Sequence, residues 1–233
     1  MNIGELAVAC FAYSALTGYA DSFDGFVSSV DGDPDLSKAD HRQAMLRWLN
    51  QWGCRQFSLE YHTLALSELL EWYHQSAVVL PETDRQLWEL SAAELEQYAE
   101  HFDRLSARQA CIRERGGKSL SVTFGPTAAA KILFALRPKV FVAWDEPMRR
   151  EFRYDGSGRS YVEFLLKIRL DLLSLRSECQ TGEFELSALP RELDRPYSTP
   201  AQLVGEYYWV TVTRQVKIPK SAQVQRWASW LEG

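Results

Sequence analysis

The chain of 233 residues lacks long apolar runs, since no stretch approaches about eighteen uninterrupted apolar residues. The sequence therefore predicts no transmembrane helix. Its first residues, Met1 to Leu6, lack a basic segment and carry an acid at Glu5. A secretory signal peptide needs a basic start followed by an apolar core. We therefore expect a cytoplasmic protein with no membrane partner.

Cysteine is scarce and scattered, with four thiols at Cys10, Cys54, Cys111 and Cys179. No two of them form a Cys-x-x-Cys pair, and their spacing fits neither a zinc site nor an iron–sulfur cluster. We therefore expect no metal centre. We interpret the four cysteines as reduced thiols, in keeping with the expected compartment.

Positive charge is in short supply, with 26 Lys and Arg against 31 Asp and Glu and a net charge of −5. The negative net charge argues against nucleic-acid binding, but the distribution of charge along the chain does not. Residues 1–100 carry a net charge of −11, residues 101–160 carry +6, and residues 161–233 are neutral. A basic zone on an acidic protein suits local binding of phosphates. The alternative is that these basic residues only cover solvent-facing helix surfaces.

Apolar residues at helical spacing are plentiful. Hydrophobic residues make up 46% of the chain, which is ample for a packed core. The run from Tyr207 to Thr213 favours a strand by propensity, but we predict helix there. The pattern predicts helices over residues 37–52, 58–76, 91–105, 127–136, 160–179 and 201–214, and a further helical segment from 105 towards Arg115 that ends before a break at Gly116-Gly117.

Gly125 and Asp145, twenty residues apart, are the most informative pair. Gly125 opens an apolar helix with Pro126 at a first-turn position. A short loop then delivers Asp145, which can cap the next helix. A glycine turn before a helix brings backbone N–H groups and the positive end of the helix dipole close to an anion such as phosphate.

This arrangement resembles the core of the helix-hairpin-helix DNA glycosylases, the superfamily that includes endonuclease III. In that family a hairpin of the form Leu-Pro-Gly-Val-Gly-x-x-Thr-Ala precedes an aspartate that is followed by an apolar and a basic position. Gly125 takes the place of the second hairpin glycine, and Asp145 falls at the family's spacing. Met148 and Arg150 fit the two positions after it, whereas Thr123 replaces the first hairpin glycine. The resemblance covers roughly residues 120–150.

The resemblance implies an all-α fold, a two-lobed helical bundle with a helix-hairpin-helix and a central cleft. Residues 1–233 would form a single glycosylase-like unit. Residues 1–35 and 155–233 would make a terminal lobe. Residues 37–153 would make a helical lobe that holds the hairpin, at about residues 116–136, and Asp145 at the cleft.

The same resemblance implies a DNA glycosylase with Asp145 as its catalytic residue. Such an enzyme hydrolyses the N-glycosidic bond of a flipped-out damaged or modified base and leaves an abasic site. A carboxylate beside the sugar stabilises the positive charge that develops as the bond breaks. Relatives that also cut the strand carry a lysine two residues after the second hairpin glycine, and this lysine forms a Schiff base. Thr127 occupies that position, so the resemblance implies a monofunctional enzyme without lyase activity.

The implied partner is double-stranded DNA that contains a modified base, bound by a monomer. No cofactor and no iron–sulfur cluster are expected, although hairpin carbonyls in the family often hold a monovalent cation. The candidates for DNA contact are Thr123, Phe124, Gly125, Thr127, Lys131, Lys118 and Arg150. A flipped base needs aromatic walls, and the candidates for this pocket are Trp144, which adjoins Asp145, together with Trp48, Trp52, Asn50, Gln51 and Tyr161.

Two other interpretations stay open. The chain could be a non-catalytic helix-hairpin-helix DNA-binding module, which would not need a competent Asp145. It could also be a helical interaction protein with no role on DNA. The sequence does not identify the excised base, and both repair of the cell's own DNA and defence against modified foreign DNA are open.

Overall fold

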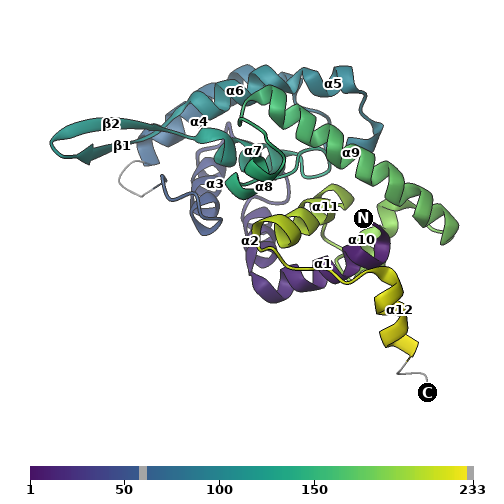
Figure 1. The fold of residues 1–233 in the computed structure, drawn as a ribbon. Helices are drawn as coiled ribbons and strands as arrows, with labels where there is room; N and C mark the ends of the chain where they lie inside the picture. Colours follow the sequence, from purple (N-terminus) through teal and green to yellow (C-terminus); the bar gives the residue numbers. More distant parts are fainter. Residues whose placement is uncertain (58–61, 230–233) are drawn as a thin grey trace.

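The computed structural model describes residues 1–57 and 62–229, and this part of the chain is mainly helical (Figure 1). The helical class predicted from the periodicity is therefore confirmed. Among the described helices, none is by itself long and apolar enough to cross a membrane, whereas the bent pair α1 and α2 passes the same test of length and composition. The helices are α1 (Ile3–Leu16), α2 (Tyr19–Ser29), α3 (Ala39–Gln51), α4 (His62–Ser76), α5 (Ala92–Glu96), α6 (Tyr98–Ala107), α7 (Gly125–Leu136), α8 (Glu146–Glu151), α9 (Gly158–Thr181), α10 (Leu189–Glu192), α11 (Pro200–Tyr208) and α12 (Ser221–Ser229).

The apolar helix α7 lies at the centre of the core. Its residues from Ala128 to Leu136 are buried except at Lys131. A helix that is apolar on all sides is stable only when other elements cover it. Phe134 packs against Phe23 of α2 and Trp52 at the end of α3, with ring centroids 4.6 and 5.6 Å apart. Helix α6 also packs against α7. These contacts fix the start of α7 and the loop that leads from it to α8.

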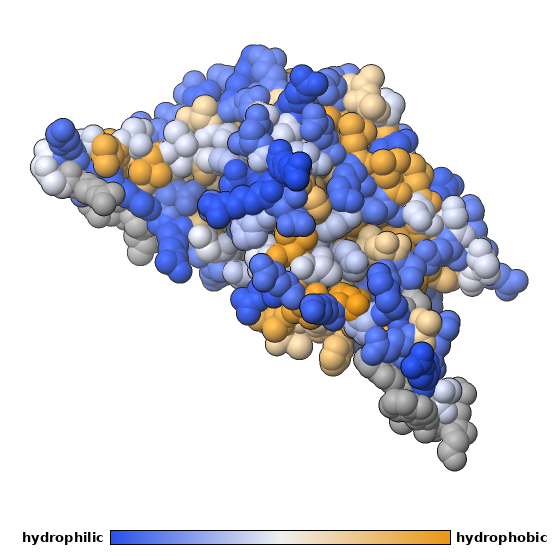
Figure 2. Space-filling model, viewed as in Figure 1, coloured by the Kyte–Doolittle hydropathy of each residue, from blue (hydrophilic) through white to orange (hydrophobic). Residues whose placement is uncertain are grey.

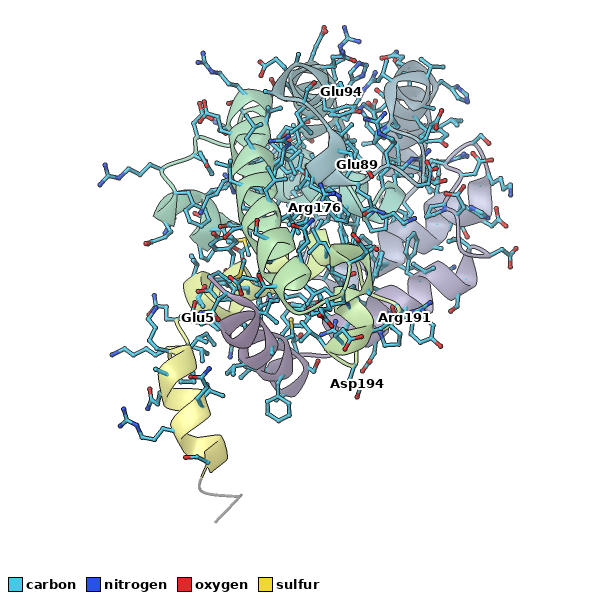
Figure 3. All side chains as sticks on the ribbon, turned by 90° about the vertical axis from the view of Figure 1, so that its right-hand side faces the viewer. Glu5, Glu89, Glu94, Arg176, Arg191 and Asp194 are labelled. Atoms are coloured by element: carbon cyan, nitrogen blue, oxygen red, sulfur yellow. The ribbon has the colours of Figure 1, made fainter. Side chains whose placement is uncertain are left out.

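The N-terminal helix α1 packs against the C-terminal part of the chain that precedes α12. Helix α1 packs against α11 and against the π-helix Trp209–Thr213 that follows α11. Figure 3 shows Glu5 beside the start of α12, where its carboxylate pairs with Lys220 at 3.2 Å. Beyond this pair, α12 stands away from the body of the protein (Figures 1 and 3). Helices α1 and α11 thus lie together, although they come from opposite parts of the chain.

Residues 109–123 form a β-hairpin, which contradicts the helix predicted towards Arg115. Strands β1 (Gln109–Arg115) and β2 (Lys118–Thr123) pair antiparallel. Gly116 and Gly117 make the turn, with φ of +60° and +74°. Two successive positive φ values match the twist of a two-residue hairpin, and glycine adopts them without strain. The Gly-Gly pair therefore reverses a strand and does not merely end a helix, and the chain enters the Gly125 turn from β2.

This hairpin, residues 109–123, is called the arm below, because it projects from the body of the protein (Figure 1). Figure 2 shows apolar atoms on it, and its exposed large apolar residues are Ile112 and Leu120. Arg113 lies opposite Leu120 across the ladder, and both Arg113 and Lys118 are exposed. The arm thus presents basic and apolar side chains to solvent.

The remaining predicted helices differ from the observed ones mainly at their ends. The segment expected over 91–105 divides at Gln97 into α5 and α6. The segment expected over 201–214 is helical, with its last part wound as a π-helix, so the strand alternative is not formed. Residues 58–61 of the helix expected over 58–76 lie outside the described residues.

Helices α6 and α9 meet at Gly158 without room for a side chain. A Cβ added there would lie 1.9 Å from the carbonyl oxygen of Ala99, a backbone atom that cannot turn aside. We expect Gly158→Ala to lower the free energy of unfolding by about 2 kcal/mol, because the two helices would have to separate. Urea denaturation, followed by circular dichroism, measures this change.

Gly25→Ala is the matched control for that experiment. Gly25 is exposed within α2, and an added Cβ would meet nothing within 4 Å. Alanine favours a helix interior over glycine by roughly 0.8–1 kcal/mol, so this variant should be slightly more stable than the parent. Equal stabilities of the two variants would contradict the close approach of α6 and α9.

Candidate functional site

A cavity of about 550 Å³ lies where the N-terminal, central and C-terminal segments meet. Its walls come from α1 and α2, from residues 52–56, from α7, from residues 142–148 and from residues 202–214. Small-molecule sites in proteins commonly have volumes of roughly 300–1,000 Å³. The cavity is therefore large enough for a small organic ligand, and Asp145 forms part of its wall.

Asp145 is held from two directions. It is the N-cap of α8, and its Oδ1 accepts a hydrogen bond from the N–H of Met148 at 3.0 Å, which confirms the predicted cap. The hydroxyl of Thr213 lies 2.9 and 2.8 Å from the two carboxylate oxygens and donates to them. Asp145 is nevertheless only half-buried. Its carboxylate is thus fixed in position at the cavity wall.

Trp144 fixes the loop that carries Asp145. Its Nε1 donates to the carbonyl of Pro126 in the first turn of α7 at 3.0 Å. Its ring packs edge to face against Phe102 and Tyr161, with centroids 5.8 and 5.0 Å apart. A buried tryptophan whose N–H is paired has little freedom to move. The hydrogen bond from Trp144 to Pro126 therefore holds the loop at Asp145 close to the turn at Gly125, although the two lie twenty residues apart.

Aromatic rings form another part of the wall. Tyr19 lies 5.4 Å from Trp52 and 5.9 Å from Trp209 between ring centroids, and Tyr13 lies 5.2 Å from Trp209. The Nε1 of Trp52 donates to the carbonyl of Tyr19 at 3.1 Å. A flat, apolar ligand can stack on such rings.

Lys131 extends from α7 into the cavity wall. Its Nζ donates a hydrogen bond to the carbonyl of Trp52 and lies 5.7 Å from the centroid of the Trp52 ring. Thr127, one turn earlier on α7, also lines the cavity. The structure therefore places Lys131 beside the aromatic wall, whereas the sequence pattern indicated a contact to the DNA backbone.

Glu206 adds a buried ion pair to the wall. Arg195 donates to both of its carboxylate oxygens, at 2.9 and 2.8 Å, and Gln202 Nε2 donates to Oε1 at 3.1 Å. Burial raises the pKa of Glu206, and the charge of Arg195 opposes that shift. Glu146, which also lines the cavity, pairs with Arg150. Within the described residues, Asp145 is thus the one acid of the cavity wall without an ion pair.

The six predicted pocket residues divide into three pairs. Trp52 and Trp144 line the cavity. Trp48 and Tyr161 lie in the core, where Tyr161 donates to the carbonyl of Val142 at 3.0 Å. Whether an aromatic residue faces the core or the cavity depends on how its helix is oriented in the fold. The spacing of residues in the sequence does not reveal that orientation.

Asn50 and Gln51 lie outside the cavity lining. The Nδ2 of Asn50 donates to the carbonyl of Phe57, and Gln51 accepts a hydrogen bond from Ser22 at 2.6 Å. Both amides are thus engaged in contacts within the N-terminal third of the chain.

The predicted DNA-contact residues are also distributed over different environments. Thr123 and Lys118 are exposed on the arm, and Gly125 begins α7 with φ of +71°. Phe124 is buried and packs against Phe57 at 5.0 Å between ring centroids. Its carbonyl accepts a hydrogen bond from Gln56 at 2.8 Å, so this oxygen already has a partner where the resemblance implied a cation.

Several residues of the cavity carried no signal in the sequence. Thr213 contacts Asp145 across 68 positions of the chain, and Tyr13 and Glu206 come from opposite ends. The sequence feature nearest to them is the run from Tyr207 to Thr213, whose β-branched and aromatic residues are unusual in a helix. Its residues Trp209 to Thr213 form a π-helix, a rare element that is frequent at functional sites. It brings Trp209 and Thr213 into the same wall.

No group of three or more His, Cys, Asp or Glu side chains suited to a metal ion occurs in residues 1–57 and 62–229. The four cysteines are free and buried. Burial raises the pKa of Cys54, which lines the cavity near Lys131, above its usual range. A thiol with a raised pKa is a poor nucleophile at neutral pH.

Comparison with known proteins adds no relative from which a function could be carried over to this cavity. No protein-family model matches the chain, and neither a curated protein nor a solved structure matches it.

Proposed function

We propose that the chain is a monofunctional DNA glycosylase that hydrolyses the N-glycosidic bond of a flipped-out damaged or modified base in double-stranded DNA and leaves an abasic site. One observation carries this proposal. A carboxylate without an ion pair, Asp145, is fixed in the wall of a cavity whose other walls include Tyr19, Trp52 and Trp209.

The chemistry follows from that arrangement. As the bond to the base breaks, the sugar gains oxocarbenium character, and a fixed negative charge beside it stabilises this state. The hydrogen bonds from Met148 and Thr213 hold the carboxylate in place before the reaction. The aromatic rings offer stacking surfaces for the base once it has left the duplex. Water then completes the hydrolysis.

The proposal requires a modified helix-hairpin-helix, because a β-hairpin stands between α6 and α7 where the family has a short turn. In this proposal α6 and α7 are its two helices, and the arm is an extension of its hairpin. The N–H of Phe124 donates to the carbonyl of Arg108 at 2.8 Å, which closes the base of the arm, and α6 packs against α7. The cavity would then lie in a central cleft between a lobe of residues 1–35 and 155–233 and a lobe of residues 37–153.

The arm supports duplex DNA as the partner. A two-stranded β-ribbon fits the major groove of B-DNA, and basic side chains neutralise phosphates. Arg113 and Lys118 are exposed on the arm, which leads directly to the Gly125 turn. We infer that the arm and the start of α7 bind the DNA backbone, while the target base enters the cavity.

Asp145→Asn tests the catalytic assignment. The amide keeps the size of the side chain and an acceptor for Met148, but it removes the negative charge. We expect base release to fall by ~10²-fold or more, while the circular dichroism spectrum and DNA affinity stay nearly unchanged. The assay incubates the protein with oligonucleotides that carry damaged and hypermodified bases and measures abasic sites. A variant that keeps more than roughly a tenth of the parental rate would remove Asp145 from the mechanism.

The product should be an intact strand with an abasic site. Thr127 has a hydroxyl, which cannot form the imine that strand cleavage by β-elimination requires. We therefore expect strand breaks only after added alkali or heat, and no covalent complex after treatment with borohydride. Efficient trapping would contradict this assignment. Repeating the trapping with Lys131→Gln would then show whether the amine beside Trp52 is the nucleophile.

Charge reversal on the arm tests the DNA interface. We expect Arg113→Glu/Lys118→Glu to weaken binding to all duplex sequences alike and to flatten the dependence of affinity on salt, because fewer counterions are released. Fluorescence anisotropy over a range of salt concentrations measures both effects. The matched control is Arg176→Glu/Arg191→Glu, which makes the same change in charge on the side of the molecule shown in Figure 3. Equal losses in the two double variants would mean that the arm does not face DNA.

A further inference from the structure

The cap of α8 does not by itself fix the plane of the Asp145 carboxylate. The N–H of Met148 donates to Oδ1 alone, at 3.0 Å. Rotation about the bond between Cβ and Cγ of aspartate is soft, because it joins an sp³ to an sp² carbon. One hydrogen bond to one oxygen therefore leaves the other oxygen free to swing. The hydroxyl of Thr213 lies 2.9 Å from Oδ1 and 2.8 Å from Oδ2, so it contacts both oxygens and limits that rotation.

The π-helix Trp209–Thr213 sets the direction of that hydroxyl. The N–H of Arg214 donates to the carbonyl of Trp209, five residues earlier, at 3.0 Å. A turn closed in this way holds one residue more than an α-helical turn, and one residue corresponds to about 100° around the helix axis. The π-helix packs against α8, which begins at Asp145. The extra residue thus changes the direction of Thr213, which faces the start of α8.

Thr211, in the same π-helix, makes a different contact. Its hydroxyl donates to the carbonyl of Tyr207, four residues earlier, at 2.8 Å. A threonine in a helix commonly bonds back to its own helix in this way. Thr213 instead donates to Asp145 across 68 positions of the chain, and of these two threonines it is the one that lines the cavity. The hydroxyl of Thr213 is thus directed at the carboxylate and not at its own helix.

We propose that Thr213 is a positioning residue for base release. It acts through Asp145, because it holds the plane of the carboxylate in the orientation that stabilises the developing positive charge on the sugar. A charged group that is oriented in advance needs no reorganisation during the reaction. Residues 200–213 then belong to the active site, although the resemblance to the glycosylases ends near residue 150. This inference rests on the proposed function, because it takes Asp145 to be the residue that stabilises the sugar.

Thr213→Val tests this role, because valine has nearly the same shape and no hydroxyl. We expect kcat for base release from the oligonucleotides to fall by roughly 10-fold or more, since a hydrogen bond to a charged group contributes more than one factor of ten. KM and DNA affinity should stay within about 2-fold of the parental values, because the hydroxyl acts on the transition state and not on binding. Thr213→Ser, which keeps a hydroxyl, should retain kcat to within a few-fold.

Thr211→Val is the matched control. It makes the same substitution in the same π-helix, at a residue that is also half-buried, and it should keep the parental kcat. If circular dichroism shows that Thr213→Val does not fold, Thr213→Ala removes the hydroxyl with a smaller side chain and gives the same test. The double variant Thr213→Val/Asp145→Asn adds a readout that a merely structural role would not move. Its rate should lie within about 2-fold of that of Asp145→Asn, because effects of residues that act as a unit do not add.

The outcomes separate this inference from the proposed function. An unchanged kcat in Thr213→Val would overturn the inference, as would an equal loss in Thr211→Val or a further loss of about 10-fold in the double variant. In each of these cases the parental protein still releases a base, so the glycosylase assignment stands. If the parental protein forms no abasic site in any oligonucleotide, the glycosylase assignment fails, and the role of Thr213 in that reaction fails with it.

Discussion

The burial of α7 is the constraint on which the rest of the structure depends. From Ala128 to Leu136 this helix has apolar side chains on every face, and only Lys131 escapes full burial. Such a helix must be covered on all sides, so α2, α3 and α6 take positions around it. Once α7 is covered, its start and its end are fixed, and so are the Gly125 turn and the loop to Asp145. The one side chain that is not fully buried, Lys131, then marks where the cover is incomplete and the cavity lies.

Two of the three carboxylates in the cavity wall, Glu206 and Asp145, are in different electrostatic conditions. Glu206 is buried and neutralised by Arg195, and this pair organises the neighbouring Gln202. Asp145 is only half-buried and accepts hydrogen bonds from Thr213 and Met148; it forms no ion pair within the described residues, although the charge of Arg149 acts on it from a longer distance. A paired buried carboxylate is suited to holding neighbours in place, whereas an unpaired one can respond to positive charge on a ligand. The two carboxylates therefore give one wall two different electrostatic environments.

The arm changes how the central basic zone is interpreted. Residues 101–160 carry the positive charge of an otherwise acidic protein, and part of that charge lies on a hairpin that leads into the first turn of α7. Exposed Ile112 and Leu120 on the same hairpin leave apolar surface next to Arg113. Basic side chains on a projecting ribbon suit an anionic partner surface, which is the reason for proposing duplex DNA as the partner.

The sequence by itself determined the features whose partners lie within a few residues. The cap by Asp145 depends on an N–H three positions later, and the helical segments depend on spacing of three and four residues. The chain reversal at Gly116-Gly117 was also encoded locally. Whether these glycines end a helix or join two strands depended on the pairing of the flanking segments. Only the tertiary structure decided that Thr213 would reach Asp145 and that Tyr13 would meet Trp209. The direction in which each aromatic ring points was decided in the same way. These contacts join opposite parts of the chain, and no local pattern encodes them, because their geometry is set by how the helices pack around α7.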